Sequence, residues 1–205
     1  MKILDISMPI TEDMNVYKDD PSKRPVITVV SDFTNGPAHE TKIEMNVHTG
    51  THIDMPLHML ENGQTIEDIN LEKVLTKCKV FDLVHVEEKI SAEHLSGKTI
   101  SEGDFILLKT KNSYVKNPGK DFIYLDKSGA EYLAGKKVCG VGIDSLGIER
   151  NQPGHETHKI LLSSEIVILE GLFLKDIEEG EYFLSALPIN VPRAEGAPVR
   201  AVLIV

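Results

Sequence analysis

The sequence of 205 residues has no tryptophan, two cysteines and only 5% aromatic residues. Two cysteines cannot form the dense disulfide framework of a small secreted scaffold, and Cys78 and Cys139 lie in apolar stretches typical of buried thiols. No stretch approaches the roughly 20 uncharged apolar residues of a membrane-spanning helix. Acidic residues interrupt the apolar N-terminal stretch, so we expect neither a signal peptide nor a membrane partner.

Basic residues are also scarce, with 22 Lys and Arg against 32 Asp and Glu and a formal net charge of -10. Nucleic-acid binding depends on Lys and Arg that neutralise phosphates, and the chain has no strongly basic run. We therefore expect no nucleic-acid partner. The content of 41% hydrophobic and 26% charged residues is ordinary for a globular protein, and we expect a soluble protein of the cytoplasm.

Strand-like segments dominate the chain, and we find no internal repeat and no linker, so we expect one domain over residues 1–205. Alternation of apolar and polar residues is clearest at 42–48. Other strands are expected at 2–8, 25–31, 79–86, 104–110, 138–143, 166–169, 182–187 and 199–205. The expected helices are few: 71–77 behind an Asn70 cap, a turn at 91–95, and one from Asp126 or Ser128 to Gly135. This mixed order predicts an α/β or α+β fold with a mixed sheet.

The most specific feature is a run of eleven residues, HTGTHIDMPLH, that holds His48, His52, Asp54 and His58. Imidazole and carboxylate groups are ligands for zinc, manganese or iron. In a fully extended chain His48 and His52 would lie about 13 Å apart, too far to share an ion. Gly50 between them permits a tight bend, and His52 and Asp54, two residues apart, share a face of an extended segment. The run therefore predicts a metal site, with His58 as a further ligand or a proton carrier.

A second cluster of histidines and acids lies further along the chain. His155 and His158 belong to the sequence HETH, which is not the helical HExxH zinc motif. Glu170 ends an apolar run, where a carboxylate is costly unless it is paired or binds a cation, and Glu165 is its rival. Chemistry alone does not choose between the two histidines or between the two glutamates.

The run from His48 to His58 resembles the HxGTHxDxPxH signature of the cyclase family, which includes bacterial kynurenine formamidases and isatin hydrolases. Further segments follow the family's order over nearly the whole chain: GIDS at 142–145, HKILL at 158–162, LEGL at 169–172 and GAPVR at 196–200. The resemblance implies a swivelling β/β/α fold with two divalent metal ions, zinc in most formamidases and manganese in isatin hydrolases. It also implies a homo-oligomer.

The resemblance also implies roles for individual residues. The first ion would be held by His48, His52 and Asp54, and the second by His158, with Asp54 and Glu170 bridging the two. His58 matches the acid/base histidine of the family. Tyr17 takes the place of a tryptophan that packs on the aryl ring of the substrate in formamidases.

These roles predict a metal-dependent amidohydrolase that converts N-formyl-L-kynurenine, an aryl formamide, to L-kynurenine and formate in tryptophan catabolism. Divalent ions make a water reactive at neutral pH, and a histidine can move the proton in both directions. A hydrolase of a cyclic amide such as isatin is the nearest alternative. An alternative of another class is a protein without catalysis whose metal ions stabilise the fold.

Overall fold

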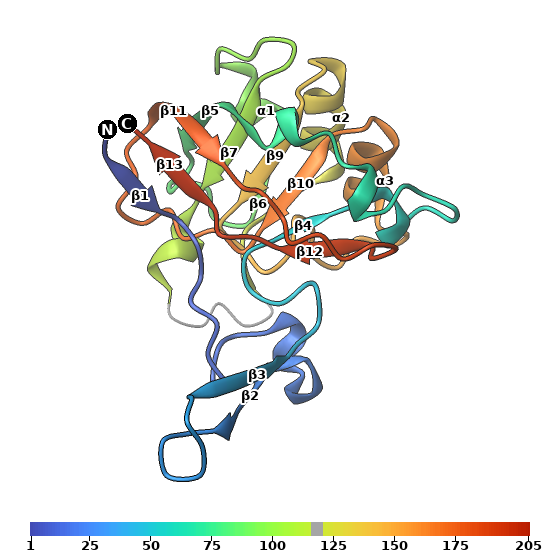
Figure 1. Ribbon diagram of the computed structural model, residues 1–205. Coiled ribbons are helices and arrows are strands. Elements are labelled where there is room, and N and C mark those ends of the chain that lie inside the picture. Colours follow the sequence, from blue (N-terminus) through green and yellow to red (C-terminus); the bar gives the residue numbers. More distant parts are fainter. Residues whose placement is uncertain (116–120) are drawn as a thin grey trace.

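The computed structural model describes residues 1–115 and 121–205, and its main element is a mixed nine-stranded sheet. Along the sheet the strands follow the order β1-β13-β11-β5-β7-β9-β10-β4-β12 (Figure 1). Four neighbours are parallel, namely β5 (Leu75–Asp82), β7 (Phe105–Lys109), β9 (Gly140–Ile143) and β10 (Val167–Glu170). The flanking strands pair antiparallel: β1 (Ile3–Asp5), β4 (His52–Asp54), β11 (Gly180–Ser185), β12 (Gly196–Pro198) and β13 (Val202–Ile204). The predicted mixed sheet is confirmed.

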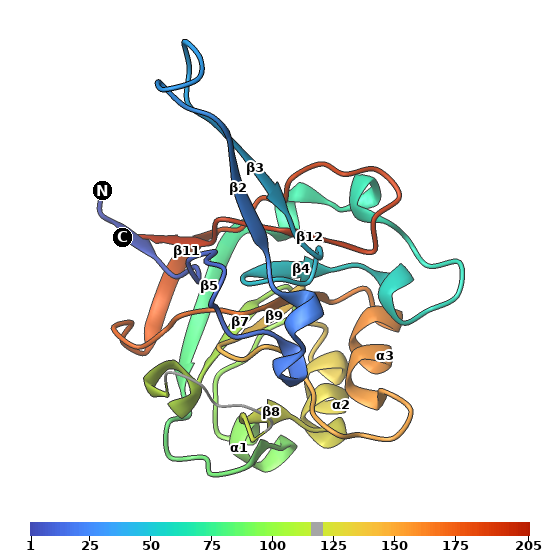
Figure 2. The same cartoon turned by 90° about the horizontal axis from the view of Figure 1, so that it is seen from below.

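Two small pairs of strands lie outside the main sheet, and one is antiparallel and the other parallel. Strands β2 (Val26–Ser31) and β3 (Glu40–Glu44) form an antiparallel hairpin that projects from the body of the protein (Figures 1 and 2). Strands β6 (Lys89–Ile90) and β8 (Tyr124–Leu125) form a short parallel pair. The α-helices of the described residues are α1 (Ala92–Ser96), α2 (Lys127–Gly135) and α3 (Glu156–Ser163). None of these helices has the length and apolar character needed to cross a membrane.

The core forms two layers because side chains alternate along each strand. In β7, Ile106 and Leu108 pack with the buried side chains of the three helices on one face of the sheet. Phe105 and Leu107 point to the opposite face and join a second buried cluster. Side chains of β4, β11, β12 and β13 belong to this second cluster, so the sheet curls over it. Both faces of the central strands are therefore buried, as a near-continuous apolar sequence predicts.

Most predicted elements are present with shifted ends, and the shifts have local causes. The strand expected at 42–48 ends at Glu44, because the Asn46 side chain accepts a hydrogen bond from the His48 N–H (2.9 Å) and turns the chain. The helix expected at 71–77 is a single 3-10 turn, Leu71–Lys73, behind the predicted Asn70 cap, because the following residues begin β5.

The longer helix begins as predicted behind Asp126, whose side chain accepts the Gly129 N–H. Helix α3 was not among the expected elements. Its signal was the spacing of His158, Leu161 and Leu162, which share one buried face.

Candidate metal centre

The pairing of β4 with β10 places three chemically active side chains on one face of the sheet. In this antiparallel pair Glu170 lies opposite His52, and Ile168 lies opposite Asp54. Ile53 belongs to the cluster beneath the curled sheet, so His52 and Asp54 point the other way, toward the helices. His52, Asp54 and Glu170 are all buried there.

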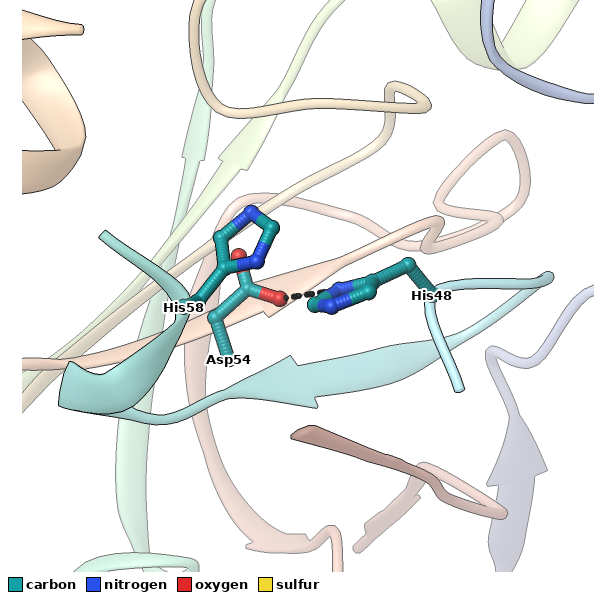
Figure 3. Close-up of side chains that lie close together, drawn as sticks. All are labelled: His48, Asp54 and His58. Atoms are coloured by element: carbon teal, nitrogen blue, oxygen red, sulfur yellow. Dashed lines mark hydrogen bonds and ion pairs between the residues drawn. The ribbon is translucent and has the colours of Figure 1, made fainter. Parts of the chain in front are cut away.

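A sharp bend before β4 brings His48 back to this face. Gly50 has a φ of +71°, which confirms the bend expected at this residue. As a result His48 Nδ1 lies 2.8 Å from Asp54 Oδ1, the contact drawn in Figure 3. The Gly50 carbonyl accepts a hydrogen bond from His52 Nδ1 (2.9 Å), which directs His52 Nε2 toward the carboxylates.

Helix α3 supplies a further imidazole. His158 is buried, and its Nε2 lies 3.5 Å from Asp54 Oδ2 and 3.3 Å from Glu170 Oε1. His155 is exposed at the start of the helix and contacts Glu149 instead. Glu165 is also exposed, and its carbonyl accepts a hydrogen bond from Lys73. The structure thus brings His158 and Glu170 to the cluster and leaves their two rivals outside it.

The distances in the cluster are those of atoms arranged around ions. Two ligand atoms that bind the same tetrahedral ion, each at about 2.1 Å from it, lie roughly 3.4 Å from one another. His52 Nε2 lies 3.4 Å from Asp54 Oδ1 and 3.4 Å from Glu170 Oε2, and His158 Nε2 faces the other oxygen of each carboxylate. Among the described residues, four buried atoms of the site have no hydrogen-bond partner: His48 Nε2, His52 Nε2, Asp54 Oδ2 and His158 Nδ1. This donor set can hold a divalent cation on each side of the carboxylate pair.

The electrostatics of the site point the same way. Burial disfavours a charged His52, yet the Asp54 and Glu170 carboxylates outweigh it and raise the pKa of His52 to about 10. Likewise, the pKa of His158 is raised well above its usual value, because Asp54, Glu149 and Glu170 outweigh the cost of burial. Two buried carboxylates therefore attract positive charge to this point, either as protons on the imidazoles or as bound cations.

A cavity of about 320 Å³ opens beside the cluster. His58, half-buried at the end of a 3-10 turn (Pro56–His58), lines this cavity, and its ring centroid lies 4.1 Å from that of His48. Figure 3 shows the His58 ring beside Asp54 and His48. Burial lowers the pKa of His58, and Asp54 opposes this shift. Tyr17 also lines this cavity, so every residue expected at the site lies in the cluster or lines the cavity.

Sequence reasoning missed two acids that also line the cavity. Glu149 Oε1 lies 3.0 Å from His158 Nδ1, and Glu195 Oε1 lies 3.3 Å from His48 Nε2. Neither residue belongs to a strand or helix, and neither is close in the sequence to a histidine that the sequence alone assigns to the site. Glu195 directly precedes the segment GAPVR, and this was the only available signal for it.

The match to a known family agrees with this geometry. A family model described as "Putative cyclase" matches residues 4–150, which is more than half of the chain. The chain belongs to this cyclase family. The kynurenine formamidase of Bacillus cereus is 29% identical over 204 residues, covering 98% of this chain and 96% of that protein.

Solved structures give the same result for the cyclase fold. A protein described as a "potential metal-dependent hydrolase with cyclase activity" has a TM-score of 0.93 and 47% identity, and the match covers 98% of this chain and 96% of the other. Isatin hydrolase A from Labrenzia aggregata has a TM-score of 0.87 at 20% identity, with 100% of this chain and 93% of the other covered. The second likeness concerns the fold alone.

The bend at Gly50 and the turn after Glu170 leave no space for a side chain between them, which gives a test. Gly171 has a φ of +68°, and a Cβ there would lie 2.2 Å from the Gly50 carbonyl oxygen that orients His52. We expect Gly171→Ala to lower the free energy of unfolding by about 1–3 kcal/mol in urea denaturation of metal-free protein.

Gly97→Ala is the matched control, since a Cβ at Gly97 meets nothing within 4 Å and the residue has an ordinary φ of -84°. An unchanged urea midpoint for Gly171→Ala would contradict the close approach of the two loops.

Proposed function

We propose that this protein is a metal-dependent amidohydrolase that converts N-formyl-L-kynurenine to L-kynurenine and formate. The observation that carries the proposal is the half-buried His58 imidazole, which lines a cavity beside a buried cluster of imidazoles and carboxylates. The similarity to kynurenine formamidases over almost the full chain supports this choice of substrate.

The proposed ligands are His48, His52 and Asp54 for one ion and His158 for a second, with Asp54 and Glu170 shared between them. Each carboxylate directs one oxygen toward His52 and the other toward His158, which fits a bridging role. Two divalent ions bound there would polarise the formyl carbonyl and lower the pKa of a water. Zinc is the proposed metal, and manganese accepts the same ligands.

His58 is the proposed acid and base. Because burial lowers its pKa, the ring is neutral at pH 7 and ready to accept a proton from the attacking water. The oxygen of that water forms a bond to the formyl carbon, and the bond from this carbon to the aniline nitrogen breaks. His58 then returns the proton to the nitrogen, so that formate and the free amine leave. The position of the ring beside His48 and Asp54 supports this role.

The side chains that line the cavity suit an aromatic substrate. Tyr17 and Met59 line the cavity, and the Phe122 ring packs against the Tyr17 ring in a tilted arrangement at a centroid distance of 6.5 Å. Burial raises the pKa of the Tyr17 phenol, so the ring stays neutral at physiological pH. A neutral aromatic face can stack on the aryl ring of a formamide.

A comparison of two substrates tests the proposed reaction. We expect kcat/KM for N-formyl-L-kynurenine to exceed that for isatin by at least about tenfold, because the kynurenine formamidases are similar to this chain over nearly its full length. Chelation of the metal should abolish turnover and leave the far-ultraviolet circular dichroism unchanged. Faster hydrolysis of isatin would assign the site to cyclic amides, and unfolding on chelation with no turnover after reloading would leave the metal a purely structural role.

The roles of His58 and Asp54 are separated by two substitutions. His58→Asn should lower kcat by about 10²–10⁴-fold while the metal content stays at the wild-type level, because only the proton carrier is lost. Asp54→Asn should reduce the content of both ions, since its carboxylate faces both positions. Metal analysis by mass spectrometry would refute the assignment of His58 if the first variant lost its ions.

We also infer that the protein forms a homo-oligomer. The hairpin of β2 and β3 exposes large apolar side chains to solvent: Val26, Val29, Val30, Phe33 and Ile43. A two-stranded hairpin is only marginally stable by itself, so contact with a second copy would stabilise it. Light scattering should give a mass of at least two chains, and Ile43→Asp should shift the protein toward the monomer. A wild-type protein that is monomeric at micromolar concentration would exclude this assembly.

A further inference from the structure

Each imidazole proposed as a ligand has one nitrogen close to the Asp54 carboxylate and its other nitrogen close to a second oxygen atom. His52 donates from Nδ1 to the Gly50 carbonyl, and His48 Nε2 lies 3.3 Å from Glu195 Oε1. His158 Nδ1 lies 3.0 Å from Glu149 Oε1, which is within hydrogen-bond distance, although the pair lacks hydrogen-bond alignment in this structure. The acceptor for His52 is backbone and Glu195 is partly exposed, whereas Glu149 is a buried carboxylate outside the proposed ligand set.

Glu149 is only 4% exposed, and neighbouring donors hold its carboxylate in place. Its Oε2 accepts hydrogen bonds from the Thr157 N–H (2.9 Å) and from Gln152 Nε2 (2.8 Å). Its Oε1 lies 2.7 Å from His155 Nδ1 in addition to the contact with His158. A buried carboxylate is costly unless such donors surround it, and here both oxygens are occupied.

We propose that Glu149 is a positioning residue that holds the proton on His158 Nδ1 and thereby leaves Nε2 free to bind a cation between Asp54 and Glu170. This inference rests on the proposed metal-dependent function. A carboxylate on the far nitrogen of a ligating histidine fixes the ring orientation and raises its basicity as a ligand. In this arrangement Oε1 stabilises the proton on Nδ1, because an ionised carboxylate only accepts hydrogen bonds.

The same geometry argues against a separate cation between Glu149, His155 and His158, although these three groups also lie close together. A cation there would need a lone pair on His158 Nδ1, but a neutral imidazole that binds metal through Nε2 carries its proton on Nδ1. The exposed His155 contributes a donor to Glu149 and is not needed for the role proposed here.

Glu149 also accepts a backbone N–H in the first turn of α3, so the test must separate orientation of His158 from support of the helix. Glu149→Gln keeps the size of the side chain and removes its charge. Gln152→Ala removes a donor to Glu149 and disturbs the same helix end without touching His158. Glu156→Gln is the inert control, since this residue pairs with Lys127 at the surface of the same helix.

The experiment measures zinc affinity by competition with a chromogenic chelator and, in parallel, the melting temperature of metal-free protein. We expect Glu149→Gln to weaken binding of the more weakly held zinc by about 10–100-fold. Gln152→Ala should lower the melting temperature with zinc affinity reduced less than threefold, and Glu156→Gln should change neither. A Glu149→Gln protein that melts earlier and binds two zinc ions with wild-type affinity would overturn the proposal.

Two further outcomes keep the proposals distinct. A wild-type protein that binds no zinc or manganese would refute the proposed function, and the positioning role with it. If Glu149→Gln does not fold, long-range ¹H–¹⁵N spectra of zinc-loaded wild-type protein give the answer directly. The proposal requires a protonated Nδ1 and a zinc-bound Nε2 on His158, and the opposite arrangement would overturn it.

Discussion

Two carboxylates, Asp54 and Glu170, are buried side by side on neighbouring strands, and the rest of the site follows from the need to compensate their charge. They are 1% and 4% exposed, and their oxygens lie within 4.8 Å of each other and of His52. Like charges at this distance in a protein interior repel strongly and lose their hydration. Neutral imidazoles cannot offset this cost. Protons on His52 and His158 can offset it. Divalent cations that displace these protons would in addition give partners to His52 Nε2 and Asp54 Oδ2.

The central strands of the sheet hold the two carboxylates in this unfavourable arrangement. Strand β10 is the last of four parallel strands, and β4 closes on it with the opposite direction. The alternation that buries Ile53 and Leu169 beneath the curled sheet directs Asp54 and Glu170 to the helical face. Free energy gained by packing the apolar residues therefore holds the acids in place, and a side chain cannot turn away without exposing its neighbours in the core.

Several parts of the site could be predicted from the sequence, because they depend on local chemistry. The bend at Gly50 follows from the short separation of His48 and His52, and the common direction of His52 and Asp54 follows from their spacing of two. The choice of His158 over His155 depended on the family resemblance, since the decisive fact is that α3 buries one histidine and exposes the other. Glu149 was missed for the same reason, because only the folded helix brings His158 to it.

Two different parts of the fold line the cavity, and this bears on the proposed substrate. The cluster is built from β4, β10 and α3, whose apolar side chains belong to the buried core. Tyr17 comes from the N-terminal segment, where it lies in a short 3-10 turn with Lys18 and Lys23 over its ring at 5.1 Å each. In the proposed function, Tyr17 would therefore act on substrate recognition, while the proposed reaction would depend on side chains that the sheet and α3 fix in position.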